Sequence, residues 1–326
     1  MSEPIGVLTM AYGTASGPDD VERYYTDIRG GRSPSPELLQ DLKDRYAAIG
    51  NRFPLLEIAK RQAAALERML NADGSGSTFR VYLGMKHAPP FIADAVRRMQ
   101  ADGIERAVGL VLAPQWSGMS VETYVERVEK ALVEGGPSFT YVRAWYGHPL
   151  FVDFLAARVS DALGRLSADR REDALVVFTA HSLPTRNVAE GGPRCKECHL
   201  CPDGCRYVEQ LSQTADLVSH RLGLEEHSLA WQSAGRTPDP WWGPSLAELI
   251  PKLARAGRRA VVVCPCGFVA DHLEILYDLD IEARGIAQEA GIAFVRTEMP
   301  NAHPDFIRAL AAVVREHVQV GAWSEP

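Results

Sequence analysis

Short apolar runs rich in β-branched residues alternate with longer amphipathic segments along nearly the whole chain. In the first half, the apolar runs predict four buried strands, at Ile5–Met10, Phe79–Leu83, Ala107–Leu112 and Thr140–Ala144. The amphipathic segments of this half predict helices near Pro36–Ala48, Leu55–Leu70, Pro90–Gln100 and Val121–Val133.

The same alternation repeats in the second half. It predicts strands at Ala174–Thr179, Ser228–Trp231, Ala260–Cys264 and Ala293–Val295, and helices near Leu150–Leu163, Tyr207–Arg221, Leu246–Ala254 and His272–Ala290. Such alternation is typical of α/β proteins with parallel sheets covered by helices on both faces. We therefore predict two Rossmann-like, doubly wound domains, residues 1–147 and 148–303, with the active-site cleft between them. A final helical stretch within 304–326 is expected to cross back to the first domain.

Chemically capable side chains stand where these strands end. Tyr12 follows the first strand, Lys86 and His87 follow the second, and His181 closes the first strand of the second half. Open α/β sheets bind ligands outside the carboxyl ends of their strands. The sequence therefore predicts one site between the two halves.

Composition and net charge restrict the classes of binding partner that the chain can have. The 326 residues are 46% hydrophobic and 24% charged, which is typical of a globular protein, and the formal net charge is -7. This acidity argues against nucleic acid or an anionic membrane as the main partner. No apolar stretch approaches the roughly 20 residues of a membrane span, and the first residues lack a basic region and apolar signal core. We expect a cytoplasmic protein without a membrane anchor.

Four of the six cysteines form one run, Cys195, Cys198, Cys201 and Cys205, spaced C-x2-C-x2-C-x3-C. In a reducing compartment such a run indicates metal ligands rather than disulfides. Four thiolates suit an iron–sulfur cluster or a tetrahedral zinc ion, and His199 could replace one of them. Free thiols this close together would oxidise. By contrast, Cys264 and Cys266 fit small buried residues, with metal binding or reactivity as the alternative.

His181 and an acidic segment further along the chain are the candidate catalytic groups. A loop histidine bound to backbone is the ordinary explanation of His181, while a base or metal ligand is the functional one. Read as an α-helix, Asp271, Glu274, Asp278 and Glu282 follow an i, i+3, i+7, i+11 spacing and form one stripe. The stripe is either a solvated helix face or a series of hard oxygen ligands for a divalent cation.

Motifs in order along nearly the whole chain resemble those of ferrochelatases, most closely the bacterial branch that uses coproporphyrin III. They are MAYGT, YYTDIRGGR, LQDLKDRYAAIG, LGMKHAPPFI, VLAPQWS, AHSLP, WQSAGRTPDPWWGP, GFVADHLEILYDLD and EMPNAHPDFI. The resemblance implies an enzyme that inserts its substrate Fe2+ into coproporphyrin III during heme biosynthesis. Transient contacts with neighbouring heme-pathway enzymes are expected on the same ground.

The resemblance also implies roles for single residues. His181 and Glu274 match the pair that receives Fe2+ and handles the pyrrole protons, and Tyr12 matches a tyrosine on the opposite porphyrin face. The positions that hold the macrocycle and its propionates are matched by Arg29, Arg45, Tyr46, Phe53 and Tyr124. Phe53 stands where relatives often carry a serine. Asp278 and Glu282 match an outer cation site.

Some bacterial ferrochelatases are similar in carrying an internal four-cysteine insertion with a [2Fe-2S] cluster, so the resemblance favours [2Fe-2S] over [4Fe-4S] and Zn2+. Two other functions stay open: a protoporphyrin IX ferrochelatase, and an iron–sulfur redox protein or iron sensor with a vestigial porphyrin cleft. A sensor would have no reason to keep both His181 and Glu274. A zinc-ribbon interaction module is disfavoured, because the chain lacks a basic stripe.

Overall fold

The computed structural model describes residues 3–72, 77–186, 194–195, 206–235 and 237–320. The strands are β1 (Ile5–Ala11), β2 (Phe79–Met85), β3 (Arg106–Val111), β4 (Ser138–Val142), β5 (Ala174–His181), β6 (Thr185–Arg186), β7 (Arg194–Cys195), β8 (His227–Gln232), β9 (Ala260–Cys264) and β10 (Ala293–Arg296). The helices are η1 (Pro18–Asp20), α1 (Val21–Ile28), α2 (Pro36–Ala48), α3 (Leu55–Asn71), α4 (Ile92–Ala101), α5 (Val121–Ala131), α6 (Pro149–Gly164), α7 (Ala168–Glu172), α8 (Arg206–Leu222), α9 (Leu246–Arg255), η2 (Ile275–Ala283), α10 (Arg284–Glu289) and α11 (Pro304–Gln319).

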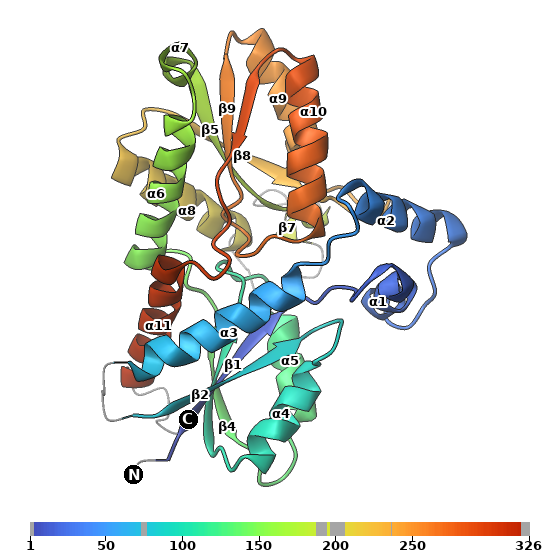
Figure 1. Cartoon of the computed structure of the whole chain (residues 1–326), viewed down its shortest axis with the longest axis vertical. Coiled ribbons are helices and arrows are strands. Elements are labelled where there is room, and N and C mark those ends of the chain that lie inside the picture. Colours follow the sequence, from blue (N-terminus) through green and yellow to red (C-terminus); the bar gives the residue numbers. More distant parts are fainter. Residues whose placement is uncertain (1–2, 73–76, 187–193, 196–205, 236, 321–326) are drawn as a thin grey trace.

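Two four-stranded parallel sheets form the framework, as the alternating pattern predicts. The first has the strand order β2-β1-β3-β4 and the second the order β10-β9-β5-β8. Figure 1 shows the first sheet in the lower half of the molecule and the second in the upper half. This arrangement confirms the α/β fold class with two Rossmann-like halves.

The central strands are apolar because helices cover the sheets. Every residue of β1 and of β9 is buried, which is the continuous burial expected of strands inside a parallel sheet. Around the first sheet, α3 packs on β2 and α4 packs on both β1 and β2.

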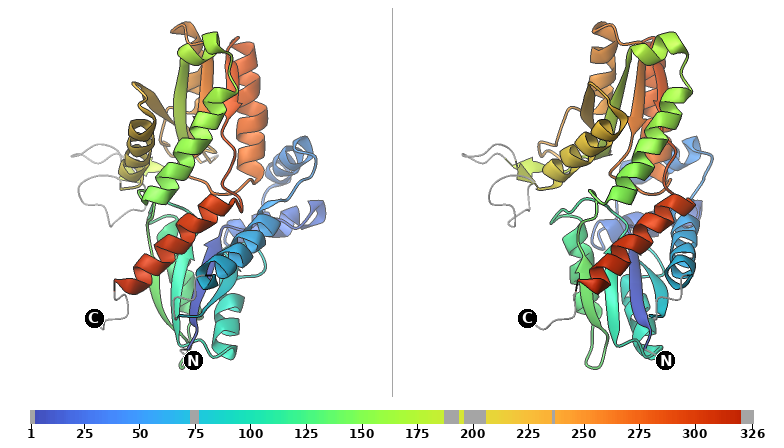
Figure 2. Two further views of the ribbon diagram at one scale, coloured as in Figure 1. Left: turned by 60° about the vertical axis from the view of Figure 1, so that its left-hand side comes forward. Right: turned by 90° about the vertical axis from the view of Figure 1, so that its left-hand side faces the viewer.

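The last helix leaves the second half and returns to the first. Figure 2 shows α11 lying alongside α3. Arg315 on α11 donates to the carbonyl oxygens of Met69 and Leu70, at 2.9 and 3.1 Å. The boundaries of the domains as separate folding units stay a prediction.

Some elements differ from the predicted ones. Helices α1 and α7 and the small antiparallel pair β6–β7 were not predicted, because each is short and α1 buries only Val21 and Tyr24. Within the predicted helix at His272–Ala290, nine residues form the π-helix η2. Apolar periodicity does not distinguish the two hydrogen-bonding patterns, since both bury one face.

Candidate active site

Ends of strands from both halves bear the chemically capable groups. Tyr12 follows β1, Lys86 and His87 follow β2, and His181 is the last residue of β5. Glu274 directly precedes η2, and α2 of the first half contacts η2. In Figure 1, α2 accordingly lies beside the end of the helix that continues into α10. The two halves therefore meet at the helix that carries the acidic residues.

His181 and Glu274 face each other. His181 Nε2 lies 3.7 Å from Glu274 Oε1, and 35% of each side chain is exposed. His181 Nδ1 is hydrogen-bonded to the carbonyl oxygen of Ser182. A carbonyl can only accept, so Nδ1 carries a ring proton, and Nε2 is the ring nitrogen that is left to act as a base when the imidazole is neutral. The pair thus presents a base and a carboxylate to the same point.

The backbone beneath His181 is fixed by its neighbours. The Tyr207 hydroxyl donates to the His181 carbonyl at 3.1 Å, and the Ser182 hydroxyl donates to the Trp242 carbonyl at 2.8 Å. Tyr207 stands near the start of α8, the helix that follows the cysteine run. The position of the imidazole therefore depends on α8 as well as on β5.

A second imidazole contacts the same carboxylate. His272 Nε2 lies 3.5 Å from Glu274 Oε2, and His272 Nδ1 is hydrogen-bonded to the Ala270 carbonyl at 2.9 Å. Burial alone would raise the pKa of Glu274, but the charge of His181 and the hydrogen bond from His272 lower it to about 2. Glu274 is therefore ionised at neutral pH.

Asp278 is the most buried acid of the stripe, at 8% exposure. It accepts a hydrogen bond from Ser233 Oγ, and Arg45 Nη1 lies 3.6 Å from its Oδ1. Burial first, and then the negative charge of Glu274, raise the pKa of Asp278 to about 7. Its proton is therefore gained or lost near neutral pH.

The predicted stripe needs one correction. Asp271 lies before η2, where its backbone N–H donates to Asn301 Oδ1 and its carboxylate pairs with Arg296. Glu282 is exposed, and its charge helps raise the pKa of Asp278. The stripe therefore consists of Glu274, Asp278 and Glu282, and the spacing argument was wrong for Asp271 because the chain has not yet entered the helix there.

Tyr12 brings the first half to the site. Its side chain is 42% exposed, and its ring centroid lies 4.7 Å from that of His87. Desolvation first, and then the carboxylate of Glu274, raise the pKa of the Tyr12 hydroxyl. The Tyr12 hydroxyl is therefore protonated at neutral pH.

A cationic group lies beside Tyr12. Lys86 Nζ lies 5.2 Å from the ring centroid of Tyr124 and donates to Thr123 Oγ1 at 2.6 Å. Arg127, one helical turn beyond Tyr124, donates to the Lys86 carbonyl at 2.5 Å. Burial, and then the charge of Arg127, lower the pKa of Lys86 to about 8.

The remaining predicted porphyrin-binding residues lie directly after α1, on α2 and in the loop after α2. The Arg29 guanidinium lies over the Tyr25 ring at 5.9 Å, and its Nε is buried without a hydrogen-bond partner among the described residues. Tyr46 is buried, and its ring stacks on Phe53 with centroids 4.3 Å apart. Arg45, which the resemblance assigns to porphyrin binding, contacts Asp278 at 3.6 Å and another acid, Asp41, at 3.4 Å.

The two cysteines outside the run are packing residues. Cys264 and Cys266 are fully buried, and burial raises the pKa of the Cys264 thiol to about 12. A buried thiol with a raised pKa is a poor nucleophile. This confirms the interpretation of both as small core residues. The predicted metal-binding run, Cys195 to Cys205, lies outside the described residues apart from the backbone of Cys195 in β7.

Sequence reasoning missed three groups at the site: His272, Ser233 and Arg127. His272 could have been found from its place two residues before Glu274, and Arg127 from its i+3 spacing to Tyr124. Ser233 has no such signal. It reaches Asp278 only because it follows β8, which neighbours β5 in the sheet.

The sequence pattern that defines the ferrochelatase family matches residues 4–318. The chain belongs to the ferrochelatase family. Among its ferrochelatase relatives, the coproporphyrin III ferrochelatase of Anoxybacillus flavithermus is 46% identical over 317 residues, which are 97% of this chain and 96% of the relative. The coproporphyrin III ferrochelatase of Bacillus subtilis is 46% identical over 312 residues, covering 95% and 96% of the two chains.

Solved chelatase structures share the fold of this ferrochelatase. SirB from Bacillus subtilis with Fe3+ aligns over 98% of each chain with a TM-score of 0.57 and 13% identity. The sirohydrochlorin chelatase SirB from Bacillus subtilis subspecies spizizenii, in complex with cobalt, gives a TM-score of 0.54 at 12% identity, again over 98% of each chain. At such identity the likeness shows the fold alone. Within the described part of the chain, no helix has the length and apolar character that a membrane span requires.

Proposed function

We propose that this ferrochelatase inserts Fe2+ into coproporphyrin III to give Fe-coproporphyrin III in heme biosynthesis. Relatives named for that activity are 46% identical over nearly the whole chain. The observation that carries the proposal is the approach of His181 Nε2 to Glu274 Oε1 at 3.7 Å.

Metal insertion exchanges two pyrrole N–H protons for Fe2+, so it needs a proton acceptor and a weak metal ligand near the ring centre. His181 would accept the two protons one after the other at Nε2 and release each to solvent, since its Nδ1 already donates to a carbonyl. Ionised Glu274 would compensate the metal's charge and offer an exchangeable oxygen ligand. One imidazole and one carboxylate hold Fe2+ weakly, which allows the metal to leave for the ring.

The direction of metal delivery is part of the proposal. Asp278 and Glu282 would form an outer cation site along η2, one and two turns away from Glu274. Arg45 competes for Asp278, so a cation arriving there would displace the guanidinium from its contact at 3.6 Å.

Anchoring of the propionates is proposed for cationic groups around the site. Arg29 has a buried Nε without a partner among the described residues, and a guanidinium binds carboxylates bidentately. Lys86 and Arg127 add charge beside Tyr12 and Tyr124. Phe53, whose ring stacks on the buried ring of Tyr46, would contact the macrocycle by stacking.

We expect the purified chain to metallate coproporphyrin III, and protoporphyrin IX with kcat/KM lower by roughly 10²-fold or more. Protoporphyrin IX carries fewer propionates, and each lost charge-assisted hydrogen bond costs about 1.5–3 kcal/mol. Anaerobic mixing with Fe2+ while the Soret band is followed measures both rates. Absence of any shift toward the metalloporphyrin spectrum with either porphyrin would refute the enzyme, and equal rates would refute only the substrate preference.

We further propose that Cys195, Cys198, Cys201 and Cys205 hold a [2Fe-2S] cluster, ahead of [4Fe-4S] or Zn2+. The chemistry of four thiolates supports the proposal. Both flanks of the run attach close to His181: Cys195 pairs with Thr185 in β6–β7, and Tyr207 donates to the His181 carbonyl. When bound, such a cluster would supply one-electron redox capacity or a structural brace at this loop.

The purified chain is expected to be brown and to contain two irons and two acid-labile sulfides. Cys198→Ser should lose the colour and lower the Tm, whereas Cys264→Ala, which removes a buried thiol outside the run, should keep the colour. Absorption spectra, iron and sulfide analysis and thermal unfolding measure these effects. A colourless wild type with one bound zinc ion would contradict the cluster.

The proposed setting is the cytoplasm. A net charge of -7 disfavours contact with anionic membrane surfaces. The product would pass to the next heme-pathway enzyme by transient contact.

A further inference from the structure

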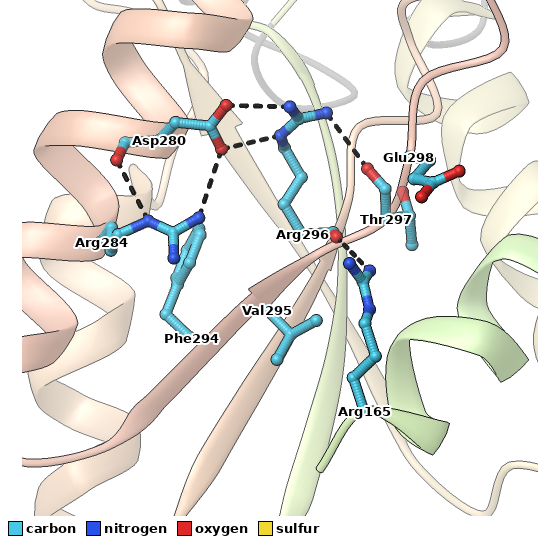
Figure 3. A pocket seen from close by; sticks show the side chains of 8 residues that line it. All are labelled: Arg165, Asp280, Arg284, Phe294, Val295, Arg296, Thr297 and Glu298. Atoms are coloured by element: carbon cyan, nitrogen blue, oxygen red, sulfur yellow. Dashed lines mark hydrogen bonds and ion pairs between the residues drawn. The ribbon is translucent and has the colours of Figure 1, made fainter.

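A shallow pocket of about 320 Å³ lies beside β10 and η2, and neither His181 nor Glu274 lines it. Figure 3 shows three arginines in it, Arg165, Arg284 and Arg296, which at first suggest an anion site. All three arginines are instead bonded to other groups of the protein. Arg284 and Arg296 both contact Asp280, and Arg165 donates to the Arg296 carbonyl. The pocket is therefore the surface of an internal network.

Arg296 is the centre of that network. Its Nε donates to Asp280 Oδ1 at 2.9 Å and its Nη2 to Asp280 Oδ2 at 2.8 Å, the bidentate geometry drawn in Figure 3. The same Nη2 lies 3.3 Å from Asp271 Oδ1. Only 14% of the Arg296 side chain is exposed, so solvent screens these pairs less than surface pairs.

Asn301 completes the network from the other side. Its Oδ1 accepts from the Asp271 backbone N–H, and its Nδ2 donates to Asp271 Oδ2, both at 2.8 Å. The Asn301 backbone is left-handed, with φ 43°. Its carbonyl accepts from Gln62 Nε2 at 2.9 Å, and Gln62 belongs to α3 of the first half. We name Asp271, Asp280, Arg296 and Asn301 together the carboxylate clamp.

The carboxylate clamp holds both ends of the segment 271–280, which contains Glu274 and Asp278. Asp271 precedes the helix and Asp280 lies within η2, while Arg296 ends the edge strand β10. The segment needs such support for two reasons. A π-helix is a rare backbone conformation, and the like charges of Glu274, Asp278 and Glu282 repel one another along it.

We propose that Arg296 and Asn301 are positioning residues that fix the direction of Glu274 toward His181. Asp271 is next to His272, whose ring contacts Glu274 Oε2 while His181 faces Oε1. A shift of Asp271 would move His272 and the carboxylate together. Through Gln62 the same clamp also sets the position of this segment relative to the first half, which carries Tyr12. The role in metal insertion rests on the proposed function.

The experiment compares Arg296→Gln and Asn301→Gly with a matched control, Arg284→Gln. Asn301→Gly keeps the left-handed backbone accessible while it removes the amide. Arg284 lines the same pocket and pairs with the same Asp280, at 3.6 Å. It contacts β10 through its guanidinium, which lies 5.5 Å from the centroid of the Phe294 ring, rather than through the bidentate hydrogen bonds by which Arg296 joins Asp280 to the strand. Arg296→Lys retains the charge without the bidentate fork and should rescue activity only in part.

For the two clamp variants we expect kcat/KM for Fe2+ to fall about 10- to 100-fold, which is typical for residues that orient metal ligands. The Kd for coproporphyrin III, measured by fluorescence quenching, should stay unchanged, as should all parameters of Arg284→Gln. Rates are expressed per porphyrin-binding site, so that loss of folded protein is not counted. If the clamp variants differ from wild type only in Tm and in the number of binding sites, the positioning role is refuted.

Amide hydrogen exchange gives a readout that does not need activity. Exchange across 273–283 should become about tenfold faster or more in Arg296→Gln, and change much less in Arg284→Gln, because only the first loses the bidentate hydrogen bonds between Asp280 and β10. If wild type proves inactive while this difference appears, the proposed function fails and the clamp stands. Equal exchange in the two variants would refute the clamp itself.

Discussion

Replacement of Glu274 by Gln, or of His181 by Ala, is expected to lower Fe2+ insertion by roughly 10²- to 10⁴-fold, the range typical of general acid–base groups. Gln keeps the shape of Glu274 but removes the negative charge that two imidazoles stabilise in the folded chain. Ala at 181 removes the nitrogen that faces Glu274 at 3.7 Å. Anaerobic turnover of coproporphyrin III, followed at the Soret band, measures both effects.

Porphyrin binding by these variants should persist, because the proposed anchors Arg29, Lys86 and Arg127 lie in the first half. Glu289→Gln on α10 and His220→Ala on α8 are suitable controls, since both residues are exposed and lie outside the site. Turnover at the wild-type rate in either site variant would show that the pair does not carry the chemistry, even if the family assignment holds.

The sequence was sufficient for the framework of this molecule. Apolar runs such as those that became β1 and β9 are buried along their whole length, so period and composition alone identify them. It was also sufficient to place both side chains at the carboxyl ends of strands, because Tyr12 follows β1 of the first sheet and His181 ends β5 of the second.

Tertiary contacts determine the features of the site that the sequence does not predict. Whether Asp271 joins the acidic stripe depends on where the helix starts, and that start is set by Asn301, thirty residues away in sequence. The pairing of Arg45 with Asp278 depends on how α2 meets η2. Local spacing carries no information on either contact.

Asp278→Asn is expected to stabilise the fold at pH 8 by roughly 2 to 4 kcal/mol and to change stability little at pH 4. In the folded chain, burial and the neighbouring charge of Glu274 raise the pKa of Asp278 from 3.8 to about 7. The folded chain therefore binds this proton more tightly than the unfolded chain does. Stability falls as the pH rises from about 4 to about 7, and Asn removes that loss.

Urea unfolding of wild type and Asp278→Asn between pH 4 and pH 8 measures the difference. Glu282→Gln is the matched control, because it removes a charge from the same stripe at an exposed position. It should change the pH dependence of the free energy of unfolding much less. If the two proteins differed by the same free energy of unfolding at every pH in this range, the Asp278 carboxylate would be ionised throughout. The charge of Arg45, at 3.6 Å, would then outweigh the effect of burial. A larger difference at high pH would instead show that the fold bears an energetic cost to keep a second acid beside Glu274, as expected where charge is retained for function.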